Sequence, residues 1–444
     1  MGNSIDASQR VGIDALIQQA HGRYTAANPK SLSQYKTARK VLPGANTRTV
    51  LHYDPFPVTI VKGQGAKIWD VDDHVYTDFL GEYTAGLYGH SNKAICNAIK
   101  SALDSGITLG GPSLVESKLA KLICDRFPAV ERIRFCNSGT EANILNISAA
   151  RAITGKTDVL VVEGSYHGSV LTFVGDSPMN LPFPIHRMTY NDTESAVDLI
   201  HRLASNLATV LVEPMIGAGG AIPATREFLS GLRDATQETG ALLIFDEVMT
   251  SRITAGGLHG FHGIKPDLVT FGKYLGGGLT FGAFGGSADI LERFDPSRKA
   301  AWPHAGTFNN NILTMTAGYT GLNEVFTAEV ANAFFDSGNN FRQTLSSAVA
   351  ELELPVQITG LGSIMAFHFS ETPPTAPINP AQTSSKLYEL IHIDMMLRGQ
   401  YFARRGMINL SLPMTDETFA NFQSDFVAVL KARASTIRDL FESG

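Results

Sequence analysis

The stretch "LVTFGKYLGGGLTFGAFGG" (residues 268–286) contains one lysine, Lys273, among seven glycines and carries no other charge. Its first part, "LVTFG", is a short apolar run without polar alternation, which is typical of a strand buried on both faces. A single ammonium group in such surroundings is costly to bury unless it has a partner. The stretch therefore predicts a buried strand that ends in a lysine that is either paired or chemically active.

Similar apolar runs precede this one and alternate with helical segments. They are "RIRFC" (132–136), "DVLVVE" (158–163), "TVLVEP" (209–214) and "ALLIFDE" (241–247), followed by "DLVTFG" (267–272). Alternation of buried strands and helices predicts an α/β fold with a mostly parallel sheet. Polar groups follow every run, at the carboxyl ends of strands, where open α/β sheets bind ligands. Those groups are "NSGTEA" (137–142), Tyr166 and His167 in "GSYHG", Glu213, Asp246 and Lys273.

The flanking regions have a different texture. We expect helical structure over residues 10–40 and a hairpin at 67–80 that turns at Asp72-Asp73. After residue 325 we expect an amphipathic helix, a strand pair at 356–369, an exposed loop at 370–385, a strand near 403–413 and one final helix with Asp416 as its N-cap. The predicted division is an N-terminal segment (1–65) that joins the small domain, a large domain (66–324) and a C-terminal small α+β domain (325–444).

Composition limits the class of protein. The chain has 444 residues, 44% of them hydrophobic and 18% charged, and a net charge of −6, which is ordinary for a globular protein. We expect no nucleic-acid partner because no Lys/Arg-rich run occurs, and no membrane partner because no apolar run is long enough to span one. Three cysteines at no metal-ligand spacing indicate reduced thiols, a cytoplasmic protein and no metal site. The first residues show neither a secretory apolar region nor, with Asp6, a myristoylation pattern.

The turn Ser138-Gly139-Thr140 lies between a strand and a helix. A helix N-terminus offers free N–H groups and a positive dipole end to a phosphate, although an ordinary capped turn would use the same residues. The acid Asp246 ends a buried strand, where it could hold a protonated ring nitrogen, cap a helix or pair with Arg252.

Lys273 follows Asp246 by 27 residues, one helix and one strand later. This spacing can place the two side chains at the mouths of neighbouring strands. Desolvation would lower the pKa of the lysine and favour a Schiff base with an aldehyde. Together with the phosphate cradle and the aromatic loop of Tyr166 and His167, these residues describe a pyridoxal 5'-phosphate site.

Across nearly the whole chain, "NSGTEA", "YHG", "FDEVMTSR", "TFGKYLGGG" and "HAGTFNNN" resemble the class III aminotransferases in order and spacing. The resemblance implies the pyridoxal-phosphate-dependent transferase fold type I: a large domain with a mostly parallel seven-stranded sheet, a small α+β domain, and a homodimer with sites at the interface. It implies that Lys273 forms the Schiff base and moves a proton, and that Asp246 holds the ring nitrogen. The other implied cofactor contacts are Ser138, Gly139 and Thr140 on the phosphate, Tyr166 and Val248 on the two ring faces, His167 and Glu213 beside them, and Thr307 on the neighbouring subunit's phosphate.

Within the class, the chain resembles the glutamate-1-semialdehyde aminomutase branch and, more closely, its β-amino acid aminotransferases. The motifs are "PGANTRTVLHYDPFPV" (43–58), "EYTAGLYGHS" (82–91), "GTFNNN" (306–311) and "YFARRGMINLSL" (401–412), with Ser251-Arg252 where the wider class often has Gly-Phe-Arg. The resemblance implies that Arg48 and Arg405 bind substrate carboxylates, with Arg404 as the alternative to its neighbour. It also implies that Tyr83, Ala85 and Tyr88 line a side-chain pocket. For the arginines a surface position, and for these three residues plain core packing, are the alternatives.

The expected function is transfer of the amino group of a β-amino acid to 2-oxoglutarate or a similar keto acid by a ping-pong mechanism. The alternatives are a glutamate-1-semialdehyde 2,1-aminomutase or a broad-range ω-amine transaminase, and more remotely a non-catalytic protein on the same fold. A nucleotide-binding phosphate loop is excluded, because no G-x-x-x-x-G-K-[ST] pattern occurs. The sequence leaves open the preferred side chain, the enantiomer, the physiological acceptor and the pathway.

Overall fold

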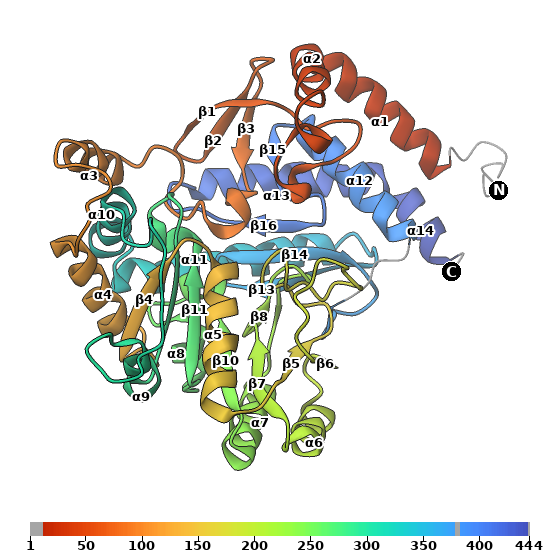
Figure 1. Cartoon of the computed structure of the whole chain (residues 1–444). Coiled ribbons are helices and arrows are strands. Elements are labelled where there is room, and N and C mark those ends of the chain that lie inside the picture. The colour runs from red at the N-terminus through yellow and green to blue at the C-terminus, as the bar shows by residue number, and fades with distance from the viewer. Residues whose placement is uncertain (1–11, 378–381, 443–444) are drawn as a thin grey trace, which may run out of the picture.

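The structure is a computed structural model that describes residues 12–377 and 382–442. Its centre is a seven-stranded sheet of order β4-β12-β11-β10-β7-β5-β6 (Figure 1). The strands are β4 (Arg132–Cys136), β5 (Asp158–Val162), β6 (Ile185–Met188), β7 (Leu207–Val212), β10 (Leu242–Asp246), β11 (Leu268–Gly272) and β12 (Gly282–Gly286). The pairings from β6 to β11 are parallel, whereas β12 runs antiparallel to both of its neighbours. The predicted mostly parallel sheet is confirmed.

All five predicted strands of this sheet are present. Strands β5, β7, β10 and β11 are almost completely buried, which explains why they read as continuous apolar runs. The sequence reading missed β6 and β12. Strand β6, "IHRM", is only partly buried, and β12, "GAFGG", has too many glycines to show a strand propensity.

Helices cover the large sheet. Helix α5 (Gly139–Thr154) packs along β11 and β12 and lies in front of the strands in Figure 1. The other helices of this part are α3 (Lys93–Leu103), α4 (Leu114–Arg126), α6 (Thr193–Leu203), α7 (Arg226–Thr239), α8 (Gly257–His262), α9 (Ala288–Leu291) and α10 (Ile312–Thr320). In Figure 1 the large sheet lies in the lower part of the molecule, and its upper edge faces the small part.

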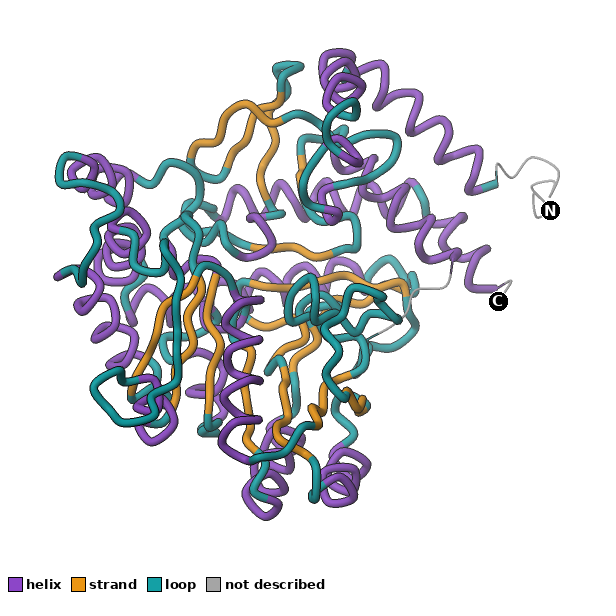
Figure 2. The backbone as a smooth tube through the Cα atoms, viewed as in Figure 1, coloured by secondary structure: helices purple, strands orange, loops and turns teal. Residues whose placement is uncertain are grey.

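Two smaller sheets lie above that edge (Figure 2). One contains β1 (Ile60–Gln64), β2 (Lys67–Asp70), β3 (Val75–Asp78) and β15 (Gln400–Tyr401), and the other contains β13 (Val356–Leu361), β14 (Ile364–Phe369) and β16 (Met407–Asn409). The predicted hairpin and strand pair are confirmed. The proposed domain boundary at residue 65 falls between β1 and β2, which pair with each other. Because β3 also pairs with β15, we now place residues 60–78 with the small domain. The short strands β8 (Met215–Ile216) and β9 (Ile222–Pro223) form a separate ribbon.

The helices of the small part confirm one expectation, the helical N-terminal region, and correct three others. The N-terminal helical region is two helices, α1 (Ile13–Ala27) and α2 (Pro29–Ala38). The final helix is also two, α13 (Asp416–Ala432) and α14 (Ala434–Glu442), and Thr415 rather than Asp416 is the N-cap because its hydroxyl accepts the N–H of Thr418. The expected loop at 370–385 overlaps α12 (Gln382–Met396), and residues 378–381 lie outside the described structure. Helix α11 (Ala328–Ala350) contains the predicted amphipathic segment.

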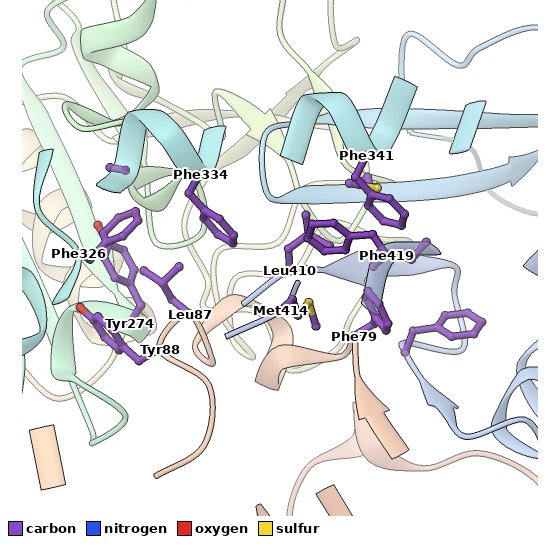
Figure 3. Close-up of a cluster of buried hydrophobic side chains, with 14 of the residues drawn as sticks. Phe79, Leu87, Tyr88, Tyr274, Phe326, Phe334, Phe341, Leu410, Met414 and Phe419 are labelled. Carbon is purple, nitrogen blue, oxygen red and sulfur yellow. The ribbon is translucent and has the colours of Figure 1, made fainter. Parts of the chain in front are cut away.

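One hydrophobic cluster joins the large and small parts. Phe79 and Leu410 from the small part share it with Tyr274 and Phe326 from the large part (Figure 3). The contact is continuous and buried, so it fixes how the two parts sit relative to each other. Among the described residues, no helix has both the length and the apolar character needed to cross a membrane. No group of three or more metal-ligating side chains gathers within the same ranges.

Candidate active site

Lys273 follows β11 and begins the short helical turn η6 (Lys273–Gly276). Its φ angle is +55°, a left-handed conformation that costs energy in any residue except glycine. Burial lowers the pKa of its ammonium to about 8, against the opposing influence of Asp246 and Glu213. The residue is therefore a half-buried amine that gives up its proton more easily than an ordinary lysine.

Asp246 ends β10, the neighbour of β11, and is 5% exposed. Its Oδ2 accepts hydrogen bonds from Nδ1 of His167 at 2.8 Å and from Nδ2 of Asn143 at 2.7 Å, and its Oδ1 accepts the N–H of Val248 at 3.0 Å. Three donors compensate the carboxylate for the water it has lost. The alternative pairing with Arg252 is wrong, since Arg252 donates to two backbone carbonyls instead.

Three polar side chains that the sequence reading did not single out support Asp246. Thr270 Oγ1 donates to Asn143 Oδ1 at 2.7 Å and accepts from Asn146 Nδ2 at 2.8 Å. Asn143 thereby keeps its amide nitrogen turned toward Asp246. The available signal was the spacing of Asn143 and Asn146 on the helix face that packs on β11, where polar residues are unusual.

The turn Ser138-Gly139-Thr140, called the phosphate-type turn below, has the geometry expected of a helix start. Ser138 is the N-cap of α5, and its hydroxyl accepts the N–H of Glu141 at 3.1 Å. A Cβ on Gly139 would lie 2.6 Å from Val248 Cγ2, so only glycine lets the turn approach Val248. A Cβ on Gly168, whose φ is +125°, would lie 2.2 Å from Thr140 Oγ1. The turns that carry Thr140, His167 and Val248 are therefore packed against one another.

Tyr166 and Glu213 lie next to this cradle. The N–H of Tyr166 and the N–H of Gly217 donate to the two oxygens of Glu213 at 3.1 and 3.0 Å. Burial raises the pKa of Glu213, while His167 opposes that rise. Tyr166 itself is 44% exposed, so its ring is free to contact a bound molecule.

Arg405 faces this group from the small part. Its guanidinium carbon lies 5.0 Å from the ring centroid of Tyr83, and that of Arg48 lies 5.8 Å from the same ring. Burial lowers the pKa of Arg405, with Tyr83, Glu213 and Tyr166 acting in the opposite direction. The side chain is nevertheless open to solvent, so its guanidinium can be reached by a bound carboxylate. Arg48 is exposed and forms an ion pair with Glu82.

Arg404 points elsewhere. It donates to Glu389 on α12 at 2.7 Å, and His21 contacts the same carboxylate. Tyr88 is 5% exposed and packs near Tyr274 in the main core (Figure 3), an arrangement that fits the core-packing alternative. Ala85 is half-buried just after the Tyr83 segment.

Thr307 is exposed on the loop before α10. Asn309, two residues further on, accepts a hydrogen bond from Asn137 at 2.9 Å, which ties this loop to the start of the phosphate-type turn.

These residues fit pyridoxal phosphate. The N-terminus of α5 would offer backbone N–H groups to a phosphate, Asp246 would offer a ring nitrogen a buried, hydrogen-bonded carboxylate, and Lys273 would supply a partly deprotonated amine. Val248 packs next to Gly139 and Gly272, and the N–H of Tyr166 is bonded to Glu213, so both residues belong to the same group. The fold and the site together define a pyridoxal-phosphate-dependent enzyme that works on amines.

The family is then plain. Residues 50–389 match the model of the class-III aminotransferases, and the chain belongs to that family. It is 46% identical over 405 residues to the beta-phenylalanine transaminase of Variovorax paradoxus, which covers 91% of this chain and 93% of the relative. A crystal structure of a beta-phenylalanine aminotransferase from the same organism superimposes with a TM-score of 0.94 at 44% identity, over 96% of this chain and 99% of the other.

An aminomutase is also similar. Glutamate-1-semialdehyde 2,1-aminomutase 2 of Geobacillus thermodenitrificans is 37% identical over 363 residues, which covers 78% of this chain and 84% of the relative. Both the transaminase and the aminomutase relatives therefore span most of the chain.

The lowered pKa of Lys273 predicts how the cofactor-free protein takes up pyridoxal phosphate. Only the neutral amine attacks an aldehyde, so the rate of reconstitution should rise with pH and level off above about 8. Stopped-flow absorbance in the visible range measures this rate. A rate that keeps rising toward the pKa of an ordinary lysine would show that the amine is not desolvated as described.

Proposed function

We propose that this chain moves the amino group of a β-amino acid to 2-oxoglutarate or a similar keto acid, using pyridoxal phosphate in a ping-pong cycle. The observation that carries the proposal is that the guanidinium groups of Arg48 and Arg405 both lie over the ring of Tyr83, at 5.8 and 5.0 Å from its centroid. Two arginines offer two positions for a carboxylate. A donor with one carboxylate and an acceptor with two could therefore use the same pair of arginines.

Separate residues of the chain would orient the substrate, keep the cofactor ring protonated and transfer the proton. Arg405 and Arg48 orient the substrate by its carboxylates, and Asp246 keeps the ring nitrogen protonated. Bound pyridoxal phosphate supplies an aldehyde carbon that bonds the amine and a pyridinium ring that withdraws electrons from the neighbouring carbon. Lys273 would act as the base that takes the proton from the carbon that carries the amino group, and as the acid that gives a proton back.

We also propose a homodimer with its sites at the subunit interface. Thr307 is exposed on a loop beside the phosphate-type turn, which leaves it free to reach the phosphate of a second copy.

The three cysteines are free thiols, and Cys136 is buried. They support a cytoplasmic location, where thiols stay reduced.

The proposal is tested by incubating the holoenzyme with 3-amino-3-phenylpropionate and 2-oxoglutarate and measuring glutamate. We expect glutamate and the 3-oxo acid in equal amounts. A strict aminomutase would release no glutamate from any β-amino acid, and a broad ω-amine transaminase would accept amines without a carboxylate equally well. No glutamate from any β-amino acid would refute the proposal.

The adjacent arginines provide a matched pair of variants for the same assay. Arg405→Ala should raise the KM for both carboxylate substrates by about 10- to 100-fold, because each loses a charge-assisted hydrogen-bond donor. Arg404→Ala should leave both KM values unchanged, because that side chain is bound to Glu389. The opposite pattern would mean that Arg404 is the residue that binds substrate.

A further inference from the structure

Arg252 is the largest side chain that is completely buried in the described chain. It is 1% exposed and lies in the turn η5 (Thr250–Arg252), six residues after Asp246. It forms no ion pair with any described carboxylate, and burial lowers the pKa of its guanidinium to about 9. Burying a cation without an anion costs free energy. We therefore expect its two hydrogen bonds to have a structural role that a neutral side chain could not fill as well.

Both hydrogen bonds go to backbone carbonyls in segments that follow strands of the two smaller sheets. One guanidinium nitrogen donates to the carbonyl of Thr84 at 2.8 Å, and the other donates to the carbonyl of Leu410. Thr84 ends the segment 81–84, and Leu410 directly follows β16, five residues after Arg405. The planar fork of one arginine therefore joins the chain segment of Tyr83 to the chain segment of Arg405.

The segment that Arg252 holds is strained. Glu82, Tyr83 and Thr84 have φ angles of +48°, +52° and +82°, and three successive non-glycine residues in the left-handed region persist only where the surroundings impose it. Asp78 Oδ1 accepts the N–H of Gly81 at 3.0 Å, and Tyr83 donates its hydroxyl to the carbonyl of Val50 at 2.8 Å. Within the described contacts, the hydrogen bond from Arg252 fixes the end of the segment.

We propose that Arg252 is a positioning residue for carboxylate recognition, holding the Tyr83 ring at a fixed place beside Arg48 and Arg405. It touches neither substrate nor cofactor in this arrangement and acts through the two carbonyls. Lysine keeps the charge but has a single ammonium that cannot serve two carbonyls as a planar fork does. The inference rests on the proposed function of Arg48 and Arg405, because it concerns the same pair of arginines.

The test uses glutarate, a dicarboxylate with no reacting group, and the holoenzyme. Arg252→Lys should raise the Kd of glutarate about tenfold or more, since a displacement of about 1 Å in a binding group can cost that much, while the visible absorbance of the bound cofactor stays. The matched control is Arg126→Lys. Arg126 also donates to two backbone carbonyls, Ala255 and Phe326, but it lies on α4 and holds no part of the Tyr83 segment. Its replacement should leave the Kd of glutarate unchanged.

A double-mutant cycle separates positioning from general stability. If Arg252 acts through this pair of arginines, Arg252→Lys should add little to the Kd of glutarate once Arg405 is already alanine. Full additivity, or an unchanged Kd in the single variant, would overturn the inference. Should Arg252→Lys fail to fold, Arg252→Gln tests the same link with one donor group and no charge. Because glutarate binding needs no turnover, the result stands even if no β-amino acid yields glutamate, which would refute the proposed function alone.

Discussion

Lys273→Ala should abolish transamination, with kcat falling by at least about 10⁴-fold. Under the proposed function, the variant removes both the amine that would bond the cofactor aldehyde and the group that would move the proton at the reacting carbon. The lowered pKa of Lys273, about 8, is what lets one side chain do both, since it can hold or release a proton near neutral pH. Purified variant should lack the visible absorbance of lysine-bound cofactor, and glutamate formation measures the lost turnover.

A surface lysine gives the matched control. Lys265 lies eight residues earlier and pairs with Glu131 at 2.8 Å on the exposed side of the protein. Lys265→Ala should keep both the absorbance and the rate. Added methylamine should restore a small part of the activity of Lys273→Ala, because a free amine can replace the missing proton carrier. Turnover of the alanine variant at the native rate would remove Lys273 from the chemistry altogether.

The sequence predicted the large sheet well because burial leaves a strong mark on strands. Each of the five predicted runs became a strand within two residues of its expected ends. Strand β12 could not be predicted from the same signal, because its glycines are there for close packing and carry no apolar pattern. Thr415 was missed as an N-cap in favour of Asp416, since both are good capping residues and only the backbone direction decides between them.

Some residues of the candidate site could likewise be predicted from the sequence, and others could not. Lys273 and Asp246 could be placed together because they end neighbouring strands, and strand ends converge at one edge. Asn143 and Thr270 were not recognised, and Arg252 was considered only as a partner for Asp246, because the contacts of all three depend on which polar groups face one another inside the core. The choice between Arg404 and Arg405 likewise needed three-dimensional information, namely the ion pair of Arg404 with Glu389.

Asp246 is the second residue whose loss should nearly stop the enzyme. Asp246→Asn should cut kcat by about 10²- to 10³-fold, because a neutral amide cannot hold a proton on the ring nitrogen of the cofactor. An asparagine at this position also cannot accept all three hydrogen bonds that Asp246 accepts. If the amide oxygen keeps the two donors His167 and Asn143, its NH₂ group must face the N–H of Val248, and two donors meet. We therefore expect a lower melting temperature as well, while the cofactor stays attached to Lys273.

Asp158→Asn is the matched control for that result. Asp158 also pairs with a histidine, His186, at 2.8 Å, but it lies at the amino end of β5, at the opposite edge of the sheet from Asp246. Its replacement should change the melting temperature slightly and leave kcat alone. If Asp246→Asn lowers the melting temperature but leaves kcat unchanged, the hydrogen bonds among His167, Asp246 and Asn143 only stabilise the fold. A large fall in kcat with the cofactor still bound shows instead that the charge of Asp246 acts on the ring.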